Sequence, residues 1–314
     1  MKIQCLTSNL ADAVLKVQKA VAVKSSIPTL EGINIIAKNN SLELKGYDLE
    51  LGITTTIPAN VEKPGEIVLN ARLLVEIARH LPDKNTNITV SEKLTTTITS
   101  GQSYFSIEGL NSEEYPEIPK LDESFCIEIE SRKLKKMLQQ TIFAISDDDS
   151  KPAHMGSLFE IEDGKLNIVS VDGYRFALST ENISSNINDK FIVPGKTLNE
   201  IIKLLSDDEN VIKIFAGKRH VIFNINQYSV ISRLLQGNFL DYKSAIPKQN
   251  LTTVKVKTND LINAFERTSL IITDKFKSPV SCIFSENEIK FSCTTTIGTS
   301  TDQISAKVDG ERIE

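Results

Sequence analysis

Four adjacent residues in the middle of the chain are of types that carry out acid–base chemistry. Asp172, Gly173, Tyr174 and Arg175 follow one another within the apolar run VSVDGYRFAL. A carboxylate, a phenol and a guanidinium held side by side can move protons or stabilise an anionic intermediate. The same residues also suit a tight hairpin turn, because Asp-Gly supplies the positive φ that such a turn requires. The choice between these interpretations decides whether the chain is an enzyme.

A second segment with chemical potential is VPGKTLNE, which is similar to the end of a phosphate-binding loop. That motif requires a glycine five positions before Gly195, where this chain has Lys190. The three histidines lie far apart and lack metal-ligand spacing: His80, His154 and His220. We therefore expect no metal site, no cofactor and no catalytic residues.

The four cysteines indicate neither a metal site nor a disulfide framework. They lie in strand-like stretches and show no Cys-x-x-Cys pairing: Cys5, Cys126, Cys282 and Cys293. We expect buried, reduced thiols.

The composition is that of a globular protein. The 314 residues suffice for two or three domains, and 40% hydrophobic with 25% charged residues is an ordinary balance. No run approaches the ~18–20 apolar residues of a membrane span. The N-terminal sequence MKIQCLTSNL lacks the apolar core of a signal peptide. We expect a cytoplasmic protein that does not enter a membrane.

The net charge of −5 hides an uneven distribution of charge. Lysines and arginines gather in the helix-like segments KVQKAVAVK, ARLLVEIARH and SRKLKKMLQQ, whereas acids gather in NSEEYPE, SDDDS and SDDEN. Each basic segment alone is compatible with an ordinary solvated helix face. Because the pattern recurs on these three segments and on a fourth helix that carries Lys203, against an acidic total, we favour one shared basic surface.

The chain repeats itself along its length. The segments 1–21, 125–145 and 252–272 each begin with alternating strand residues, pass a short polar stretch and continue as a helix. The helices open at leucines that are 124 and then 127 residues apart: Leu10, Leu134 and Leu261. Candidate N-caps precede them: Ser8, Ser131, and Thr258 or Asn259.

Each complete repeat contains two modules of one strand, one helix and three further strands. The second module of the first repeat, GEIVLNARLLVEIARHLPD, parallels DKFIVPGKTLNEIIKLLSD of the second repeat. The third repeat reaches only DGERIE, where a second module would begin. We predict three domains, at residues 1–121, 122–248 and 249–314, of which the last holds only its first half.

The repeat explains the four residues of the opening question. Asp48 lies 124 residues before Asp172, in KGYDLELG, without a base or nucleophile beside it. An acid at the same place in two modules favours a turn, so the catalytic interpretation is set aside. An antiparallel sheet with one face covered by two short helices per repeat predicts an α+β fold.

Four segments resemble a known family: SSIPTLEGINI, VSVDGYRFAL, VPGKTLNEI and SRLLQGNFLDYKSAIPK. They are similar to the bacterial sliding clamps, the β subunits of replicative DNA polymerase III, over the whole chain. The resemblance implies a DNA-clamp fold with antiparallel sheets outside and helices lining a concave inner face. It also implies a head-to-tail homodimer ring around duplex DNA, which is contacted without sequence specificity.

The resemblance and the helix faces together suggest residues that face DNA. Lys24, Arg72 and Lys196 match basic positions of the family, and further basic residues lie on the helices. The full set is Lys24, Arg72, Arg79, Lys135, Lys136, Lys196 and Lys203. Two tyrosines with which the family contacts DNA are replaced by Pro152 and Ala153, which weakens the expectation there.

The resemblance also implies a pocket in which the polymerase, the clamp loader and repair proteins insert a short linear peptide. Carried over by position, the pocket consists of His154, Val171, Gly173, Tyr174, Arg175, Phe176, Leu240, Ser244 and Ala245. Leu240 replaces a proline, Ser244 a basic residue and His154 a leucine of the family pattern. We therefore expect a shifted peptide preference.

Three hypotheses follow. The leading one is a sliding clamp without catalysis, and the second is a shortened clamp that binds partner peptides or the loader without encircling DNA. The third, a nucleotide hydrolase built on the Gly-Lys-Thr segment, is disfavoured by its incomplete motif. Because the third repeat contains only its first module, we expect a largely monomeric molecule.

Overall fold

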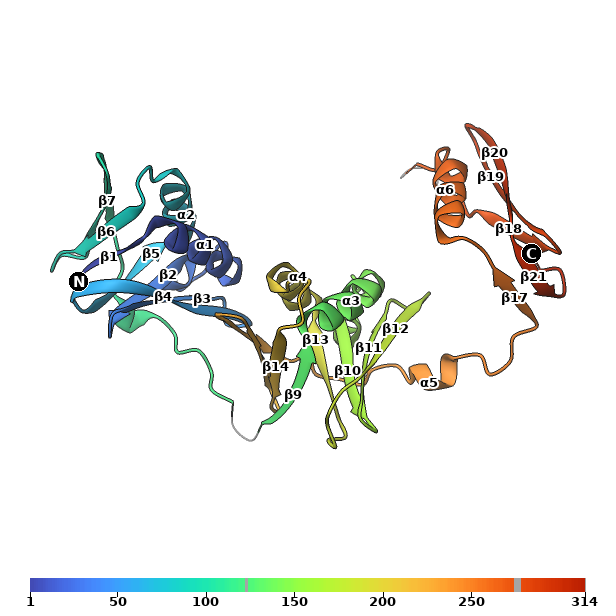
Figure 1. The fold of residues 1–314 in the computed structure, drawn as a ribbon, viewed down its shortest axis with the longest axis horizontal. Coiled ribbons are helices and arrows are strands. Elements are labelled where there is room, and N and C mark those ends of the chain that lie inside the picture. Colours follow the sequence, from blue (N-terminus) through green and yellow to red (C-terminus); the bar gives the residue numbers. More distant parts are fainter. Residues whose placement is uncertain (122–123, 274–277, 314) are drawn as a thin grey trace. The chain divides into compact units, whose positions relative to one another are not determined.

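The structure, a computed structural model, describes residues 1–121, 124–273 and 278–313. It divides into two compact units, Met1–Leu240 and Asp241–Glu314. The first unit contains the modules of the first two repeats, and the second contains the single module of the third (Figure 1). Helices and antiparallel strands alternate as the sequence predicts, so the fold is α+β.

The first repeat contains both predicted modules. The first module is β1 (Lys2–Leu6), α1 (Thr7–Val17), β2 (Gly32–Lys38), β3 (Ser41–Tyr47) and β4 (Leu51–Lys63). The second module is β5 (Gly65–Asn70), α2 (Ala71–His80), β6 (Asn85–Val90), β7 (Thr95–Ser100) and β8 (Ser103–Glu108). Short 3₁₀ turns accompany them at η1 (Gln18–Ala20), η2 (Pro28–Glu31) and η3 (Ser112–Glu114).

The second repeat has the same order of elements. Its first module is β9 (Phe125–Glu130), α3 (Ser131–Thr141), η4 (Ile142–Ala144), η5 (Pro152–Met155), β10 (Gly156–Glu162), β11 (Lys165–Val171) and β12 (Phe176–Asn182). Its second module is β13 (Asp189–Pro194), α4 (Gly195–Leu204), β14 (Val211–Ala216), β15 (His220–Ile225) and β16 (Tyr228–Arg233).

The second compact unit contains one module, a short helix before it and a strand after it. Its elements are α5 (Tyr242–Ala245), β17 (Thr252–Lys255), α6 (Thr258–Ser269), β18 (Ser281–Ser285), β19 (Glu288–Thr295), β20 (Gly298–Ser305) and β21 (Lys307–Gly310). The helix α6 packs on β19 and β20 around a small core of Ala264, Ile289 and Phe291. The four-residue helix α5 has no counterpart in the sequence prediction.

The two modules of each complete repeat exchange strands. In the first repeat β1 pairs with β6 and β5 pairs with β2, and in the second repeat β9 pairs with β14 and β13 pairs with β10. The first strand of each module therefore completes the sheet of the other. The helices α1 and α2 pack against each other, as do α3 and α4 (Figure 1). A module and its neighbour thus share one core.

The first and second repeats are joined edge to edge. Strand β16 pairs with β4 in antiparallel register, with Tyr228 opposite Thr55 and Ser232 opposite Leu51. The pairing produces a continuous sheet in the order β8-β7-β6-β1-β4-β16-β15-β14-β9. This joint removes one exposed edge from each sheet.

Side chains reinforce the joint. The Tyr228 hydroxyl donates to Asp12 Oδ2 at 2.6 Å, and Lys16 Nζ donates to the same oxygen at 3.0 Å. The ammonium of Lys16 also lies 4.8 Å from the centre of the Tyr228 ring. Burial acts to raise the pKa of Asp12, but the two hydrogen bonds and the charge of Lys16 outweigh it and lower that pKa. The joint thus contains an ionised carboxylate.

The predicted helix N-caps are wrong. The helices α1, α3 and α6 begin earlier than expected, so the proposed caps lie inside the first turn: Ser8, Ser131, Thr258 and Asn259. The residues that do occupy the N-cap positions make no side-chain cap: Leu6, Glu130 and Lys257.

Backbone carbonyls replace the missing caps of α1 and α3. The amide of Thr7 donates to the Lys84 carbonyl at 2.9 Å, and the amide of Ser131 donates to the Asn210 carbonyl at 2.8 Å. Each carbonyl comes from the segment that follows the helix of the partner module. The exchange of strands therefore satisfies the first unpaired amide of these two helices without a hydroxyl cap.

Candidate functional site

The residues of the opening question form a capped turn between β11 and β12. The amide of Asp172 donates to the Arg175 carbonyl at 3.2 Å. Asp172 Oδ1 accepts from the amides of Tyr174 at 3.0 Å and Arg175 at 3.1 Å. Gly173 has a φ of +93°, in the left-handed region that favours glycine. The prediction of a turn is confirmed.

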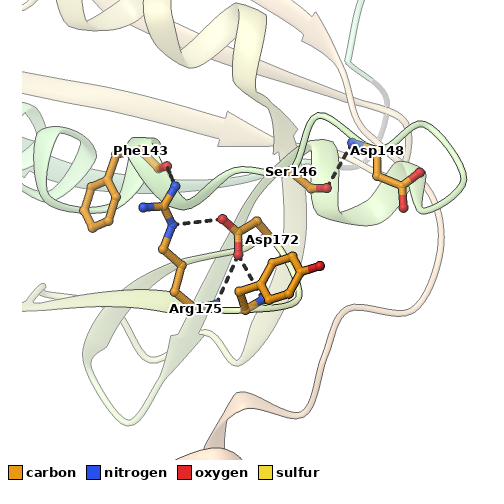
Figure 2. A network of polar contacts seen from close by, with 6 residues as sticks. Phe143, Ser146, Asp148, Asp172 and Arg175 are labelled. Atoms are coloured by element: carbon orange, nitrogen blue, oxygen red, sulfur yellow. Dashed lines mark hydrogen bonds and ion pairs between the residues drawn. The ribbon is translucent and has the colours of Figure 1, made fainter. Parts of the chain in front are cut away.

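The guanidinium of Arg175 is also committed within the second repeat. Its Nε donates to Asp172 Oδ2 at 2.8 Å, and its Nη2 donates to the carbonyl of Phe143 at 3.2 Å (Figure 2). The same guanidinium lies 5.4 Å from the centre of the Phe143 ring. Figure 2 shows this side chain linking the turn to the segment that follows α3. Its two hydrogen bonds hold the turn against η4.

The electrostatics of Asp172 argue against proton transfer. The amide of Tyr174 is the largest influence and lowers the pKa of Asp172, and the amide and guanidinium of Arg175 lower it further against an opposing effect of desolvation. A general acid or base at neutral pH needs a pKa near 7. The carboxylate of Asp172 is therefore ionised and serves as an acceptor inside the turn.

The same turn presents aromatic surface to solvent. Tyr174 is fully exposed at its tip, Phe176 is half-buried at the start of β12, and Val171 is buried at the end of β11. An aromatic side chain offered on a rigid, capped turn is a typical anchor for a protein partner. The turn therefore suits recognition better than catalysis.

His154 and Leu240 lie elsewhere in the first compact unit. His154 is in η5, and its ring meets the ring of Phe239 edge-on at a centroid distance of 5.5 Å. Burial and the charge of Lys151 lower the pKa of His154. Leu240 follows Phe239 and is exposed. The ring of His154 therefore packs against Phe239, and burial together with the charge of Lys151 favours its neutral form.

The last two residues of the predicted pocket belong to the second compact unit. Ser244 and Ala245 are exposed on α5, and the Ser244 hydroxyl donates to the Asp241 carbonyl at 2.8 Å. Their membership of the pocket stays a prediction.

The predicted DNA-facing residues fall into two groups. Three are exposed and, within the described ranges, have no acidic partner within 4.0 Å: Lys24, Arg72 and Lys136. Four are paired with acids: Arg79 with Glu76 at 3.7 Å, Lys135 with Asp207 at 2.8 Å, Lys196 with Asp48 at 2.5 Å and Lys203 with Glu200 at 2.7 Å. The first group has the larger unbalanced positive charge.

Comparison with known proteins agrees with the sequence resemblance. The family model described as the DNA polymerase III beta subunit, N-terminal domain, matches residues 1–119, and the model of the central domain matches residues 128–241. The chain belongs to this family.

Individual members of the beta subunit family are similar over most of the chain. The beta sliding clamp of Halalkalibacterium halodurans is 34% identical over 267 residues, which are 81% of this chain and 70% of that protein. The beta subunit structure from Eubacterium rectale has a TM-score of 0.94 at 31% identity. The superposition covers 100% of this chain and 86% of the Eubacterium rectale chain. The Bartonella birtlesii sliding clamp, solved bound to griselimycin, has a TM-score of 0.92 at 29% identity. The superposition covers 100% of this chain and 86% of the Bartonella birtlesii chain.

Two residues that hold predicted site residues in place in this beta subunit were not predicted from the sequence. Phe143 supports Arg175, and Asp48 holds Lys196 of the next repeat. The position of Asp48 in the repeat was visible in the sequence, but its partner lies 148 residues away, and no local signal indicates it. The aromatic character of Phe143 was visible too, although nothing distinguished it from a core residue.

The structure locates the potential metal ligands and the four cysteines of the described residues. Among the described residues, no three histidines, cysteines or acids come together as metal ligands would. Cys5 and Cys293 are buried as expected, whereas Cys282 is half-buried. Cys126 is exposed, so the prediction is wrong there, because strand β9 turns this side chain to the uncovered face of its sheet. In the part of the chain that the structure describes, no helix has the length and apolarity of a membrane span.

Proposed function

We propose that this chain is a sliding clamp, which encircles duplex DNA and tethers the replicative polymerase and other partners without catalysing a reaction. Membership of the beta subunit family supports the proposal, as does the naming of its curated relatives as beta sliding clamps. The single observation that carries it is the turn at residues 171–176. In this turn Asp172 and Arg175 neutralise each other, and the aromatic side chain of Tyr174 is exposed to solvent.

The partner site is the peptide pocket implied by the family resemblance. In this proposal Tyr174 and Phe176 supply apolar contact area, and Asp172 and Arg175 keep the turn rigid before the peptide arrives. Preorganisation of this kind reduces the entropy lost on binding. Griselimycin bound to the Bartonella birtlesii clamp shows that a relative holds a ligand.

Titration of a clamp-binding peptide tests the pocket. Replacement of Tyr174 or Phe176 by alanine is expected to weaken binding about tenfold or more, as for aromatic anchors at other interfaces. Tyr104→Ala is a matched control, because Tyr104 is an exposed tyrosine on β8 of the first repeat. Equal affinities for Tyr174→Ala, Phe176→Ala and Tyr104→Ala would reject the pocket.

The DNA surface is proposed to use unpaired cations most strongly. Lys24, Arg72 and Lys136 are free to neutralise phosphates, whereas the other predicted cations already face acids. A phosphate contact releases condensed counterions, so the affinity falls with salt at a slope of about 0.9 per contact. Contacts of this type fix no base sequence, as sliding requires.

Two triple variants with equal charge changes test this surface. The first replaces the unpaired set, Lys24, Arg72 and Lys136, with alanine, and the second replaces Arg79, Lys135 and Lys203 with alanine. The first is expected to reduce the slope of log affinity against log salt by about 2 to 3. The second is expected to reduce it less, because these three cations are already partly neutralised by their acidic partners. Equal slopes for the two variants would contradict the assignment.

Loading on nicked circular DNA distinguishes this proposal from a clamp that binds peptides without encircling DNA. In the presence of a clamp loader, an encircling clamp stays on the circle in high salt and is released when the circle is cut. Peptide binding without such retention would favour the non-encircling alternative.

A further inference from the structure

A groove in the second repeat lies beside the turn and shares only Tyr174 and Arg175 with the proposed peptide pocket. Its volume is about 620 Å³, and it lies among the segment after α3, the turn and the first residues of α4. Apolar side chains form one part of its wall: Ile142, Phe143, Ile145 and Met155. This volume is in the range of cavities that hold small ligands or one to three side chains of a partner.

Large apolar side chains around the groove are exposed to water. Phe143 is 58% exposed and Met155 is 38% exposed, and Tyr174 at the rim is fully exposed. Three exposed large side chains at one concave place are uncommon on the surface of a protein without a partner there. An aromatic ring such as Phe143 gains most when a second apolar group covers it.

The charges that line the groove are unbalanced. Arg175 is neutralised by Asp172, and Lys196 is neutralised by Asp48. Asp147 and Asp148 also line the groove, and in the described part of the chain neither has a cationic partner within 4.0 Å. Ser150 donates to Asp148 from its amide at 2.9 Å, and hydrogen bonds from Ser150, with a smaller contribution from the charge of Lys151, lower the pKa of this carboxyl group. The unsatisfied charge of the groove is therefore negative.

From this combination of walls and charges, we propose that the groove binds a cationic peptide segment in which lysine or arginine flanks an aromatic or branched apolar residue. The apolar residue covers Phe143 and Met155, and the flanking cations face Asp147 and Asp148. Charge complementarity selects this occupant, since neither Asp147 nor Asp148 forms an ion pair in the described structure, and only Asp148 is partly offset by the more distant charge of Lys151.

Calorimetric titration of the whole chain with two capped tetrapeptide amides tests this proposal. The probe is Lys-Leu-Phe-Lys, and its control is Glu-Leu-Phe-Glu. The basic probe is expected to bind at least tenfold more tightly than the acidic one, and its affinity should fall as salt is added. Equal affinities would overturn the proposal.

Variants then locate the binding. Phe143→Ala is expected to weaken the basic probe about tenfold, and the double variant Asp147→Asn, Asp148→Asn should weaken it by about three- to tenfold. Asp149→Asn is the matched control, because Asp149 is exposed in the same loop but does not line the groove. A loss for Asp149→Asn as large as that for the double variant would mean general attraction to an acidic loop and would overturn the groove.

Two further measurements keep the inference separate from other sites. Phe143 is exposed, so an unchanged melting temperature should accompany Phe143→Ala and show that the fold is intact. Asp147 and Asp148 lie outside the proposed peptide pocket, so the clamp-binding peptide should keep its affinity in the double aspartate variant. The Phe143→Ala variant could instead bind duplex DNA more weakly and the basic probe as tightly as the unmodified chain does. In that case the groove would be a nucleic-acid contact and the proposal would be wrong.

Discussion

Two turns of the molecule have the same local structure and different surroundings. Asp48 and Asp172 are 124 residues apart, and each caps its own turn. Asp48 Oδ1 accepts from the amides of Glu50 at 3.0 Å and Leu51 at 2.7 Å, as Asp172 does in the second repeat. The residue after each aspartate has a positive φ, +77° at Leu49 and +93° at Gly173.

The second carboxylate oxygen distinguishes the two turns. Asp48 Oδ2 accepts from Lys196 of α4, and only 10% of the Asp48 side chain is exposed. Asp172 Oδ2 accepts from Arg175 of its own turn, and the tip at Tyr174 stays in solvent. The first turn thus serves the joint between repeats, and the second is left for a partner. Local sequence specifies the turn, whereas the packing around it decides its use.

The largest difference should come from removing the two aspartates. Asp48→Ala leaves the amide of buried Leu51 without its acceptor and breaks the contact with Lys196, so we expect a loss of about 2 kcal/mol in the free energy of unfolding. Asp172→Ala should cost less, because its exposed amides can bond to water. Urea denaturation of both variants measures the difference. An equal loss would remove the distinction between the two turns.

Substitutions at the two residues with positive φ should change stability by different amounts. Gly173→Ala is expected to cost about 1 kcal/mol of stability, since nothing lies within 4 Å of the new Cβ and only the left-handed backbone is strained. Leu49→Gly should change stability by less than about 1 kcal/mol, because relief of that strain is offset by the chain entropy of glycine and by the loss of a side chain that is only 46% exposed. Thermal unfolding of both variants measures the two changes, and a stabilising Gly173→Ala would contradict the strain expected at this position.

The ion pair of the joint should contribute little. The side chain of Lys196 is 61% exposed, so Lys196→Met is expected to cost no more than about 0.5 kcal/mol, and less at high salt. Its effect on DNA affinity should also be smaller than that of Lys24→Met, whose ammonium has no acid beside it in the described structure. A larger effect of Lys196→Met on DNA binding would return this residue to the DNA surface.

The smallest effect concerns pH. The lowered pKa of Asp172 means that the folded state binds fewer protons than the unfolded state near the ordinary value of about 3.9. The stability from this carboxylate is therefore present above pH ~4 and is lost as the pH falls through the lowered pKa. A carbon NMR titration of Asp172 should show the low midpoint, and Arg175→Ala should raise it. A midpoint at or above about 3.9 in the unmodified chain would contradict the capped turn.

The sequence predicts the modules better than their contacts. The spacing of Leu10, Leu134 and Leu261 correctly indicates the repeated strand–helix–three-strand order, because hydrophobic periodicity is a local property. The N-caps failed because strand exchange brings in distant carbonyls, such as that of Lys84 for Thr7. Tertiary contacts of this kind leave no trace in the neighbouring residues.

The candidate site shows the same limit. Asp172 and Gly173 were predicted as a turn from their types and from the repeat, and the structure confirms it. The pairing of Lys196 with Asp48 could not be predicted, since a lysine on a helix face has the same pattern whether it meets phosphate, water or a carboxylate. Residue type indicates what a side chain can bind, and only the fold determines what lies within its reach.

Hydrogen–deuterium exchange with and without a saturating clamp-binding peptide tests the central claim most directly. The account predicts that the peptide slows exchange of the amides at residues 172–176 and leaves those at residues 48–51 unchanged. Slower exchange at 48–51, or no change at 172–176, would contradict the assignment of one turn to the joint and the other to a partner.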